Sequence, residues 1–382
     1  MIKQAQPKHG ARFEPFTTTP IAVTNDHGEW TADFELDIDA DLLQEMYRDM
    51  LAARLLDDRY STLQRSGKAS FLVSSAGHEA AQIAVAKTVK LGVDWLYPYY
   101  RDTGLVHSLG ISAKDIFGQA LATLADPNKG RQMPGHPGSS TLNIFTVCSA
   151  IASHIPPAVG TALSMKLRNQ QAVTITSFGE GATSEGDFNA AINLAGAQGA
   201  PIIFACENNG YAISVGYTKQ TAAESIAAKG EAFGLPGYVV DGMDVLSCYY
   251  VLKEVVEAAR AGHGPALLDM RVYRYNPHSS ADDDSRYRPK QEVEMWRQRD
   301  PLTRFQRFLA ARDLWDEAWE QELQETLEAG LRQAAKDAEA AGDIPDAWMF
   351  DDVFETLPWH LQEQRDKALK QLAESQASDA TH

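Results

Sequence analysis

The chain has 382 residues, of which 44% are hydrophobic and 23% are charged, and its formal net charge at pH 7 is −17. This composition is typical of a soluble globular protein, and the length allows it to bury a substantial core. The negative charge argues against nucleic-acid binding, which needs a basic surface to neutralise phosphates.

No membrane-spanning, secretory or metal-cluster pattern is visible. The sequence contains no apolar run of about 18 residues, and its N-terminus has neither an apolar signal core nor an Arg-rich transit pattern. Cys148, Cys206 and Cys248 are scattered, which is typical of a reducing compartment and unlike a zinc or iron–sulfur site. These features predict a cytoplasmic protein with no membrane contact. They also fit a mitochondrial matrix protein whose presequence has been removed.

Residues 1–38 are predicted to form an extended arm, because prolines and polar residues interrupt any helical or strand pattern. The arm also carries four large aromatic residues: Phe13, Phe16, Trp30 and Phe34. A disordered tail is the alternative, but disordered segments are poor in apolar residues. We therefore expect the arm to lie on a surface, either the chain's own or a partner's.

Residues 39–290 alternate between helical and strand patterns. A cap at Asp39 or Asp41 opens the first helix, and Ser112–Asp115 and Ser184–Asp187 have the spacing of capping boxes. The helices are expected over 39–64, 79–89, 112–124, 154–168, 184–198 and 244–261. The strands are expected over 96–100, 172–178, 201–206, 238–240 and 265–272. This alternation predicts an α/β domain with a parallel sheet flanked by helices on both faces.

The remainder of the chain looks different. Residues 277–290 form a polar, loop-like segment, and from about Pro289 the sequence becomes helical and strongly charged. We expect a helical C-terminal extension over 291–382, frayed from about residue 370.

The most informative pattern follows two of the expected strands. Gly179-Glu180-Gly181 comes after the strand over 172–178, and Asn208-Asn209 comes after the strand over 201–206. The carboxyl ends of parallel strands bind ligands, glycines allow close approach to phosphate, and a helix N-terminus favours anions. Carboxylate and amide oxygens suit Mg²⁺. Each turn alone reads most simply as an ordinary turn, but the pair predicts a site for a metal-bound diphosphate. The GxGxxG and GxxxxGK[ST] motifs of other nucleotide sites are absent.

The segment from Gly179 through ENNGYAIS resembles the thiamine-diphosphate motif in the alpha subunits of 2-oxo acid dehydrogenase decarboxylases. The resemblance covers about residues 42–289. It implies the thiamine-diphosphate-binding fold, cofactor contacts from Gly179 through Ala182, and Mg²⁺ ligands from Glu180, Asn209 and the main-chain carbonyl of Tyr211. Pyruvate-type members usually carry Asp at the position of Glu180, whereas branched-chain members often carry Glu. The branched-chain type is therefore favoured.

Two other segments resemble cofactor-binding parts of the same family. YYRDTG is similar to its Tyr-Arg segment, which assigns Tyr100 and Arg101 to the cofactor. Alone, this segment would read as a strand edge with a surface arginine. The resemblance also places Ser149 and Ile151 at the cofactor, although Ser149 alone would read as a helix cap. Some members of the family bind potassium near this turn through oxygen ligands. Cys148 and His154 differ from those ligands, so no potassium site is expected here.

The loop beginning at Arg274 resembles the family's flexible active-site loop. An arginine after a buried strand can bind phosphate, and a loop histidine that titrates near neutrality can transfer protons. The resemblance assigns Arg274 to the phosphate and His278 to cofactor contact and acyl transfer. Pro277 stands where the family often has glycine. Ser279 and Ser285 lie near positions that are phosphorylated in animal relatives of this family.

The resemblance also implies which residues contact the substrate. Phe71 would suit a branched acyl chain because it is large and apolar, although a core position explains it equally well. The expected substrate contacts are Phe71, Tyr100, Ser149 and His278.

The resemblance implies oxidative decarboxylation of a small branched-chain 2-oxo acid and acyl transfer to the lipoyl arm of an acyltransferase. The same fold acting on pyruvate or acetoin is an alternative, and a catalytically silent regulatory subunit is an alternative of another class. The intact site residues disfavour the silent subunit. The glutamate that activates the cofactor is expected from a separate beta subunit, which predicts an α₂β₂ assembly.

Overall fold

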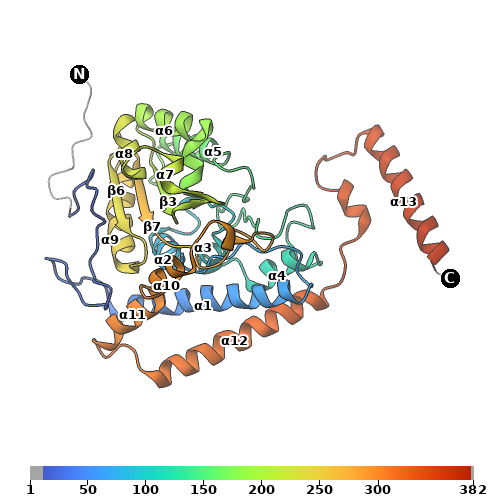
Figure 1. The fold of residues 1–382 in the computed structure, drawn as a ribbon. Coiled ribbons are helices and arrows are strands. Elements are labelled where there is room, and N and C mark those ends of the chain that lie inside the picture. Colours follow the sequence, from blue (N-terminus) through green and yellow to red (C-terminus); the bar gives the residue numbers. More distant parts are fainter. Residues whose placement is uncertain (1–11, 380–382) are drawn as a thin grey trace.

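The computed structural model describes residues 12–379, so the expectations for residues 1–11 and 380–382 lie outside the described residues. Its centre is a parallel five-stranded sheet in the order β1-β2-β3-β7-β6 (Figure 1). The strands are β1 (Trp95–Tyr97), β2 (Thr174–Gly179), β3 (Ile202–Asn208), β6 (Gly237–Asp241) and β7 (Ala266–Arg271). The order places β1, β2, β3 and β7 next to one another.

Helices cover both faces of this sheet, as the alternating pattern predicts. All seven residues of β3 are buried. Ile203 and Ala205 belong to one core, and Ile202, Phe204 and Cys206 belong to a second core on the other face. The first core includes residues of α1 (Ala40–Arg65), α2 (Glu79–Thr88) and α9 (Val245–Arg260). The second includes residues of α5 (Ile155–Leu167), α6 (Gly186–Gln198) and α8 (Ile226–Ala232). The expected fold class is confirmed.

Three of the six expected helix starts are confirmed by side-chain caps, at Asp39, Ser112 and Asp244. Asp39 accepts a hydrogen bond from Leu42 N at 2.8 Å, and Ser112 accepts one from Asp115 N at 3.1 Å to open α4 (Ala113–Leu121). The expected cap at Ser184 is wrong. Residues Glu180–Ser184 form a 3-10 turn, η1, and α6 begins after Glu185 without a side-chain cap. Because Ser184 is wound into this turn, it cannot take the extended backbone of a cap residue.

The short elements have no counterpart in the sequence pattern. They are α3 (Thr103–Ser108), β4 (Tyr211–Ala212), β5 (Val215–Gly216), α7 (Tyr217–Gln220), α8, η2 (Asp284–Arg286) and η3 (Asp346–Phe350). None is longer than seven residues, which is too short for a helical or strand period to be recognised. The helix expected over 112–124 ends at Leu121 because Ala122 adopts a left-handed conformation with φ of 54°.

The described part of the N-terminal arm lies on the chain's own surface. Phe16 N donates to Gly237 O at 2.7 Å, and Ile21 N donates to Val239 O at 2.8 Å. Asp241 N returns a hydrogen bond to Ile21 O at 2.9 Å. The arm therefore satisfies the free edge of β6, which would otherwise expose unpaired backbone groups.

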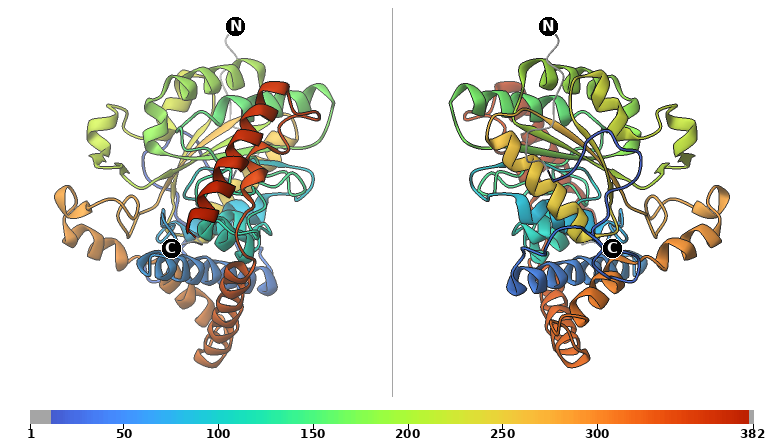
Figure 2. Two further views of the ribbon diagram at one scale, coloured as in Figure 1. Left: turned by 90° about the vertical axis from the view of Figure 1, so that its right-hand side faces the viewer. Right: turned by 90° about the vertical axis from the view of Figure 1, so that its left-hand side faces the viewer.

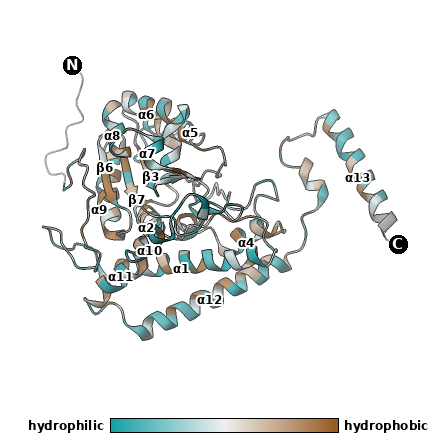
Figure 3. Ribbon diagram, in the orientation of Figure 1, coloured by the Kyte–Doolittle hydropathy of each residue, from teal (hydrophilic) through white to brown (hydrophobic). Residues whose placement is uncertain are grey.

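The C-terminal region is helical, comprising α10 (Lys290–Arg297), α11 (Pro301–Ala310), α12 (Glu317–Ala340) and α13 (Trp359–Asp379). Helix α12 packs on α1 and α4. Helix α13 stands apart from the body in Figure 1, and the side views of Figure 2 place it in front of the body or behind it. The expected fraying from residue 370 is wrong as far as Asp379, which ends α13. Figure 3 shows α12 and α13 as largely hydrophilic. No helix among the described residues is long and apolar enough to cross a membrane.

Candidate active site

The residues selected from the sequence meet at one edge of the sheet. Adjacent strands β1, β2, β3 and β7 are parallel, so their carboxyl ends lie side by side. The selected residues that end or follow these strands are Tyr100 and Arg101 after β1, Gly179 to Ala182 at β2, Asn209 and Tyr211 after β3, and Arg274 and His278 after β7. This is the edge at which parallel sheets bind ligands.

A cavity of about 290 Å³ opens at this edge. The selected residues in its wall are Tyr100, Arg101, Ser149, Ile151, Gly179, Glu180, Gly181, Ala182, Asn209, Tyr211 and His278. Arg274 and Phe71 are not in the wall. Arg274 instead reaches the cavity through His278, since its Nη1 lies 3.5 Å from His278 Nδ1. Leu72, next to Phe71, exchanges hydrogen bonds with Ser280 of the same loop.

Glu180 is buried where β2 and β3 end. Its Oε2 accepts a hydrogen bond from Asn209 N at 3.3 Å, and its Oε1 accepts one from Gln220 Nε2 at 3.2 Å. Burial raises the pKa of Glu180, and the hydrogen bond from Gln220 is the largest of the effects that lower it. Asn209 Oδ1 accepts from Tyr211 N at 3.2 Å. The carboxylate, the amide and the Tyr211 backbone therefore belong to one connected turn.

The oxygen donors of this turn suit a hard cation. Among the described residues no group of three or more His, Cys, Asp or Glu side chains could hold a metal. The turn instead combines one carboxylate with one amide, and Mg²⁺ commonly uses such sparse protein ligands together with phosphate oxygens. The donor set fits Mg²⁺ only when an anionic ligand binds beside it.

Two buried arginines supply positive charge for such an anion. Arg101 is 1% exposed and Arg274 is 0% exposed. Arg101 donates to the main-chain oxygens of Ser74 at 2.6 Å and His278 at 3.3 Å, and the Nε atoms of both arginines have no partner in the described part of the chain. Neither guanidinium is ion-paired with a carboxylate there. Buried charges are normally paired because desolvation is costly. The cavity therefore fits a multiply charged anion such as a diphosphate.

His278 lies between these arginines and is neutral. Its Nδ1 is 3.4 Å from Arg101 Nη2 and 3.5 Å from Arg274 Nη1. Burial first, and then the two guanidinium charges, lower the pKa of His278 to about 4. The expectation that it titrates near neutrality is thus not met. Because Nδ1 accepts from cationic donors, the proton resides on Nε2. His278 can therefore donate a hydrogen bond at neutral pH without carrying a charge.

The turn before α5 forms the open side of the cavity. Ser149 Oγ lies 2.7 Å from His136 Nε2, and Ile151 is 41% exposed at the rim. Cys148 Sγ lies 3.1 Å from Ser153 Oγ, so these two polar groups satisfy each other. The turn offers one hydroxyl and one apolar side chain to a ligand.

The hairpin of β4 and β5 supplies wall residues that the sequence pattern does not reveal. Ile213 has φ of 54°, which is rare for a β-branched residue, and its side chain is 55% exposed. Arg274 Nη2 donates to its main-chain oxygen at 3.1 Å. Strain of this kind is often stored at functional sites. Two-residue strands give no periodic signal, so the sequence could not have shown this residue.

A buried polar cluster supports the strand ends behind the cavity. Glu207 Oε2 lies 2.6 Å from His78 Nδ1 and accepts a hydrogen bond from Gln82 Nε2 at 3.2 Å. Gln82 Nε2 also donates to Arg101 O at 3.0 Å. Burial raises the pKa of Glu207 to about 7 and that of the neighbouring Asp102 well above its usual range. The cluster joins the turn after β1 to the carboxyl end of β3.

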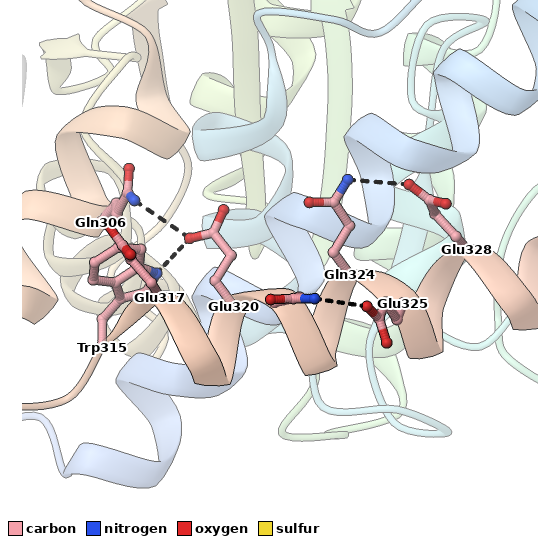
Figure 4. A pocket seen from close by; sticks show the side chains of 8 residues that line it. Gln306, Trp315, Glu317, Glu320, Gln324, Glu325 and Glu328 are labelled. Carbon is pink, nitrogen blue, oxygen red and sulfur yellow. Dashed lines mark hydrogen bonds between the residues drawn. The ribbon is translucent and has the colours of Figure 1, made fainter.

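A groove along α12 is a poorer candidate (Figure 4). Its polar side chains are acidic or amide groups that satisfy one another. Gln324 Nε2 donates to Glu328 Oε1 at 3.0 Å, and Gln306 Nε2 donates to Glu320 Oε2 at 3.4 Å (Figure 4). No buried, unpartnered polar atom among the described residues lines this groove, so nothing in it calls for a ligand.

Comparison with known proteins identifies the family of the chain. Residues 47–345 match the family model of the dehydrogenase E1 component. The chain is 43% identical over 298 residues to the 2-oxoisovalerate dehydrogenase subunit alpha of Bacillus subtilis, covering 78% of this chain and 90% of that protein. It is 37% identical over 339 residues to the mitochondrial 2-oxoisovalerate dehydrogenase subunit alpha 1 of Arabidopsis thaliana, covering 88% and 71%. The pyruvate dehydrogenase E1 component subunit alpha of Staphylococcus aureus is 37% identical over 331 residues, covering 86% of each chain.

Proposed function

The chain belongs to the dehydrogenase E1 component family, and we propose that it is the alpha subunit of a decarboxylase for branched-chain 2-oxo acids. The proposed reaction is the oxidative decarboxylation of 3-methyl-2-oxobutanoate and related acids, with transfer of the acyl group to a lipoyl arm. The observation that carries this proposal is the cavity at the strand ends. There, Glu180 and Asn209 share a wall with Arg101, one of two buried arginines that have no carboxylate partner within residues 12–379.

The family depends on thiamine diphosphate, and the described residues fit that group. The unpaired guanidinium groups of Arg101 and Arg274 would hold its diphosphate, together with the backbone of residues 179–182. Mg²⁺ would be held by Glu180, Asn209 and the carbonyl of Tyr211. When bound, thiamine diphosphate supplies the electron sink that decarboxylation needs.

The chain's own residues would orient and shield the reactants. The two arginines neutralise the diphosphate, and their burial excludes water, which strengthens each charge interaction in the cavity. The apolar side chains of Ile151 and Ile213 would contact the cofactor rings. We propose that Nε2 of His278 donates to the acyl oxygen during transfer to the lipoyl arm, since its Nδ1 is occupied by the arginines.

The substrate contacts differ in their support. Tyr100, Ser149 and His278 line the cavity and are proposed to contact the 2-oxo acid. Phe71 remains a prediction because its ring is not in the wall. Its neighbour Leu72 is hydrogen-bonded to Ser280, so the position of the His278 loop controls how near the ring lies.

The chain is proposed to work with a beta subunit in an α₂β₂ assembly and with a lipoyl-bearing acyltransferase. The named relatives are themselves alpha subunits. The segment from η3 to the first residue of α13 exposes large apolar side chains, which is a common property of interaction surfaces. These are Met349 at 58%, Val353 at 66%, Phe354 at 51% and Trp359 at 76% exposure. A bacterial, cytoplasmic setting is proposed from the likeness to the Bacillus subtilis protein, and the mitochondrial relative of Arabidopsis thaliana keeps the matrix as the alternative.

Reconstitution with the beta subunit tests the function. We expect kcat/KM for 3-methyl-2-oxobutanoate to exceed that for pyruvate, because the chain is more similar to the 2-oxoisovalerate enzyme of Bacillus subtilis than to the pyruvate enzyme of Staphylococcus aureus. A preference for pyruvate would assign the chain to the alternative substrate. Absence of turnover with any 2-oxo acid would contradict both and favour a silent subunit.

A further inference from the structure

Glu292 connects two separate parts of the candidate site. It lies on α10, at the start of the region expected to be a C-terminal extension. Its Oε2 accepts a hydrogen bond from Tyr211 Oη at 2.8 Å, and its Oε1 accepts one from Tyr273 Oη at 3.1 Å. Tyr211 belongs to the turn after β3, whereas Tyr273 directly precedes Arg274 after β7. One carboxylate therefore joins the turn that would bind the metal to the segment that would bind the phosphate.

The Tyr273 end of this connection is firmly held. Tyr273 is 2% exposed, and its ring stacks on Trp296 with centroids 5.1 Å apart and an interplanar angle of 6°. The guanidinium carbon of Arg288 lies 5.4 Å from the centre of the same ring. Trp296 lies one turn after Glu292 on α10, so the helix contacts Tyr273 through a hydrogen bond and through ring stacking. Glu292 is thus anchored to a rigid part of the fold.

The Tyr211 end is held much less firmly. Tyr211 is half of a two-residue strand, β4, which pairs only with the two residues of β5. Its backbone N–H donates to Asn209 Oδ1 at 3.2 Å, so a shift of Tyr211 displaces an amide proposed to bind the metal. The phenol ring is stiff, having two rotatable side-chain bonds. Fixing its hydroxyl to Glu292 therefore fixes the position of its backbone.

We propose that Glu292 is a positioning residue that sets the metal-binding turn at the correct distance from Arg274. The proposal rests on the function given above and adds a role for a residue outside the cavity wall. Groups that hydrogen-bond to metal-ligating residues typically change metal affinity by about 10- to 100-fold when removed. Because Glu292 acts only through the Tyr211 side chain, its removal should lower the Mg²⁺ affinity by about tenfold, the lower end of this range.

The test uses the complex of this chain with its beta subunit. The Mg²⁺ concentration needed for half-maximal thiamine diphosphate binding is measured by calorimetry. Glu292→Ala and Tyr211→Phe should each raise it about tenfold, although Tyr211→Phe keeps the backbone carbonyl. The double variant should resemble Glu292→Ala, because that change already removes the hydrogen bond from Tyr211. Glu292→Gln should recover part of the affinity, since its amide oxygen can still accept one phenol. At saturating Mg²⁺ the KM of Glu292→Ala for the 2-oxo acid should be unchanged.

Two matched controls separate positioning from general stability. Glu294→Ala changes an exposed carboxylate on the same helix, and Tyr217→Phe changes a phenol beside the same turn whose hydroxyl reaches Ala223 O instead, at 3.5 Å. Both controls should behave like the wild type.

Wild-type Mg²⁺ dependence in Glu292→Ala, or additive effects in the double variant, would overturn the proposal. The Asn209→Ala variant distinguishes a failure of the Glu292 proposal from a failure of the proposed function. If Asn209→Ala prevents binding while Glu292→Ala does not, only the role of Glu292 is wrong. If Asn209→Ala also binds normally, the metal site itself is wrong.

Discussion

Replacing Gly181 by alanine gives a steric test of the candidate site. A Cβ at position 181 would lie 2.8 Å from the Cβ of Ala212. Contacting carbon atoms normally approach to about 3.5 Å, so the two methyl groups would be about 0.7 Å too close. The backbone at Gly181 does not have the positive φ that would itself exclude alanine. The predicted cost therefore comes from the contact alone.

The overlap should be relieved by displacement of the β4–β5 hairpin. Overpacking typically costs about 1–3 kcal/mol, which corresponds to roughly 5- to 150-fold in affinity. Since Ala212 follows Tyr211, the displacement moves a proposed metal ligand. Calorimetry should show weaker Mg²⁺-dependent binding of thiamine diphosphate in Gly181→Ala, with little change in the thermal unfolding of the chain.

Gly186→Ala is the matched control, because an added Cβ there meets nothing within 4 Å. It should bind the cofactor normally. Combining Gly181→Ala with Ala212→Gly removes one of the overlapping methyl groups and should restore most of the affinity. Equal affinities for Gly181→Ala and Gly186→Ala, or no restoration in the double variant, would refute the steric reasoning.

Three further predictions concern single side chains. Asn209→Ala should abolish Mg²⁺-dependent cofactor binding in calorimetry, and unchanged binding would count against the metal site. His278→Ala should bind the cofactor but lose roughly 10²- to 10⁴-fold in acylation of a lipoyl domain, so wild-type acylation would exclude that role. The pKa of His278 is lowered to about 4, whereas a histidine in an unfolded chain has a pKa of about 6.5. Between these two pKa values, His278 is protonated in the unfolded chain but not in the folded chain. The free energy of unfolding of the protein should therefore fall as the pH falls through this range. In urea unfolding, His278→Gln should lose less stability than the wild type between about pH 7 and 5, and an equal loss would contradict this.

The sequence was sufficient for the parts of the site that follow long elements. Glu180 and Asn209 each follow a strand long enough to be recognised, and parallel pairing then brings them together. The caps at Asp39 and Ser112 were recognisable because capping depends on neighbours two or three residues away. The same reasoning failed at Ser184, where the turn that carries Glu180 takes precedence over the local capping preference.

The remaining parts of the site depend on contacts that have no local signal. Gln220 orients Glu180 from 40 residues away, and Glu292 reaches Tyr211 across 81 residues. Ile213 enters the wall through a strained turn between two-residue strands. The burial of Arg101 and Arg274 without a carboxylate partner in the described part of the chain is also visible only in three dimensions. This burial, and not the presence of two arginines in the sequence, is the evidence for an anionic ligand.

The central claim is that this cavity recognises a metal-bound diphosphate. The most direct measurement compares thiamine diphosphate with unphosphorylated thiamine in calorimetric titrations of the complex with the beta subunit, with Mg²⁺ present. Because the buried guanidinium groups and the oxygen ligands act on the diphosphate and its metal, only thiamine diphosphate should bind, and chelation of Mg²⁺ should abolish the binding. Equal affinity for the two compounds, or binding of thiamine diphosphate that does not depend on Mg²⁺, would contradict the claim.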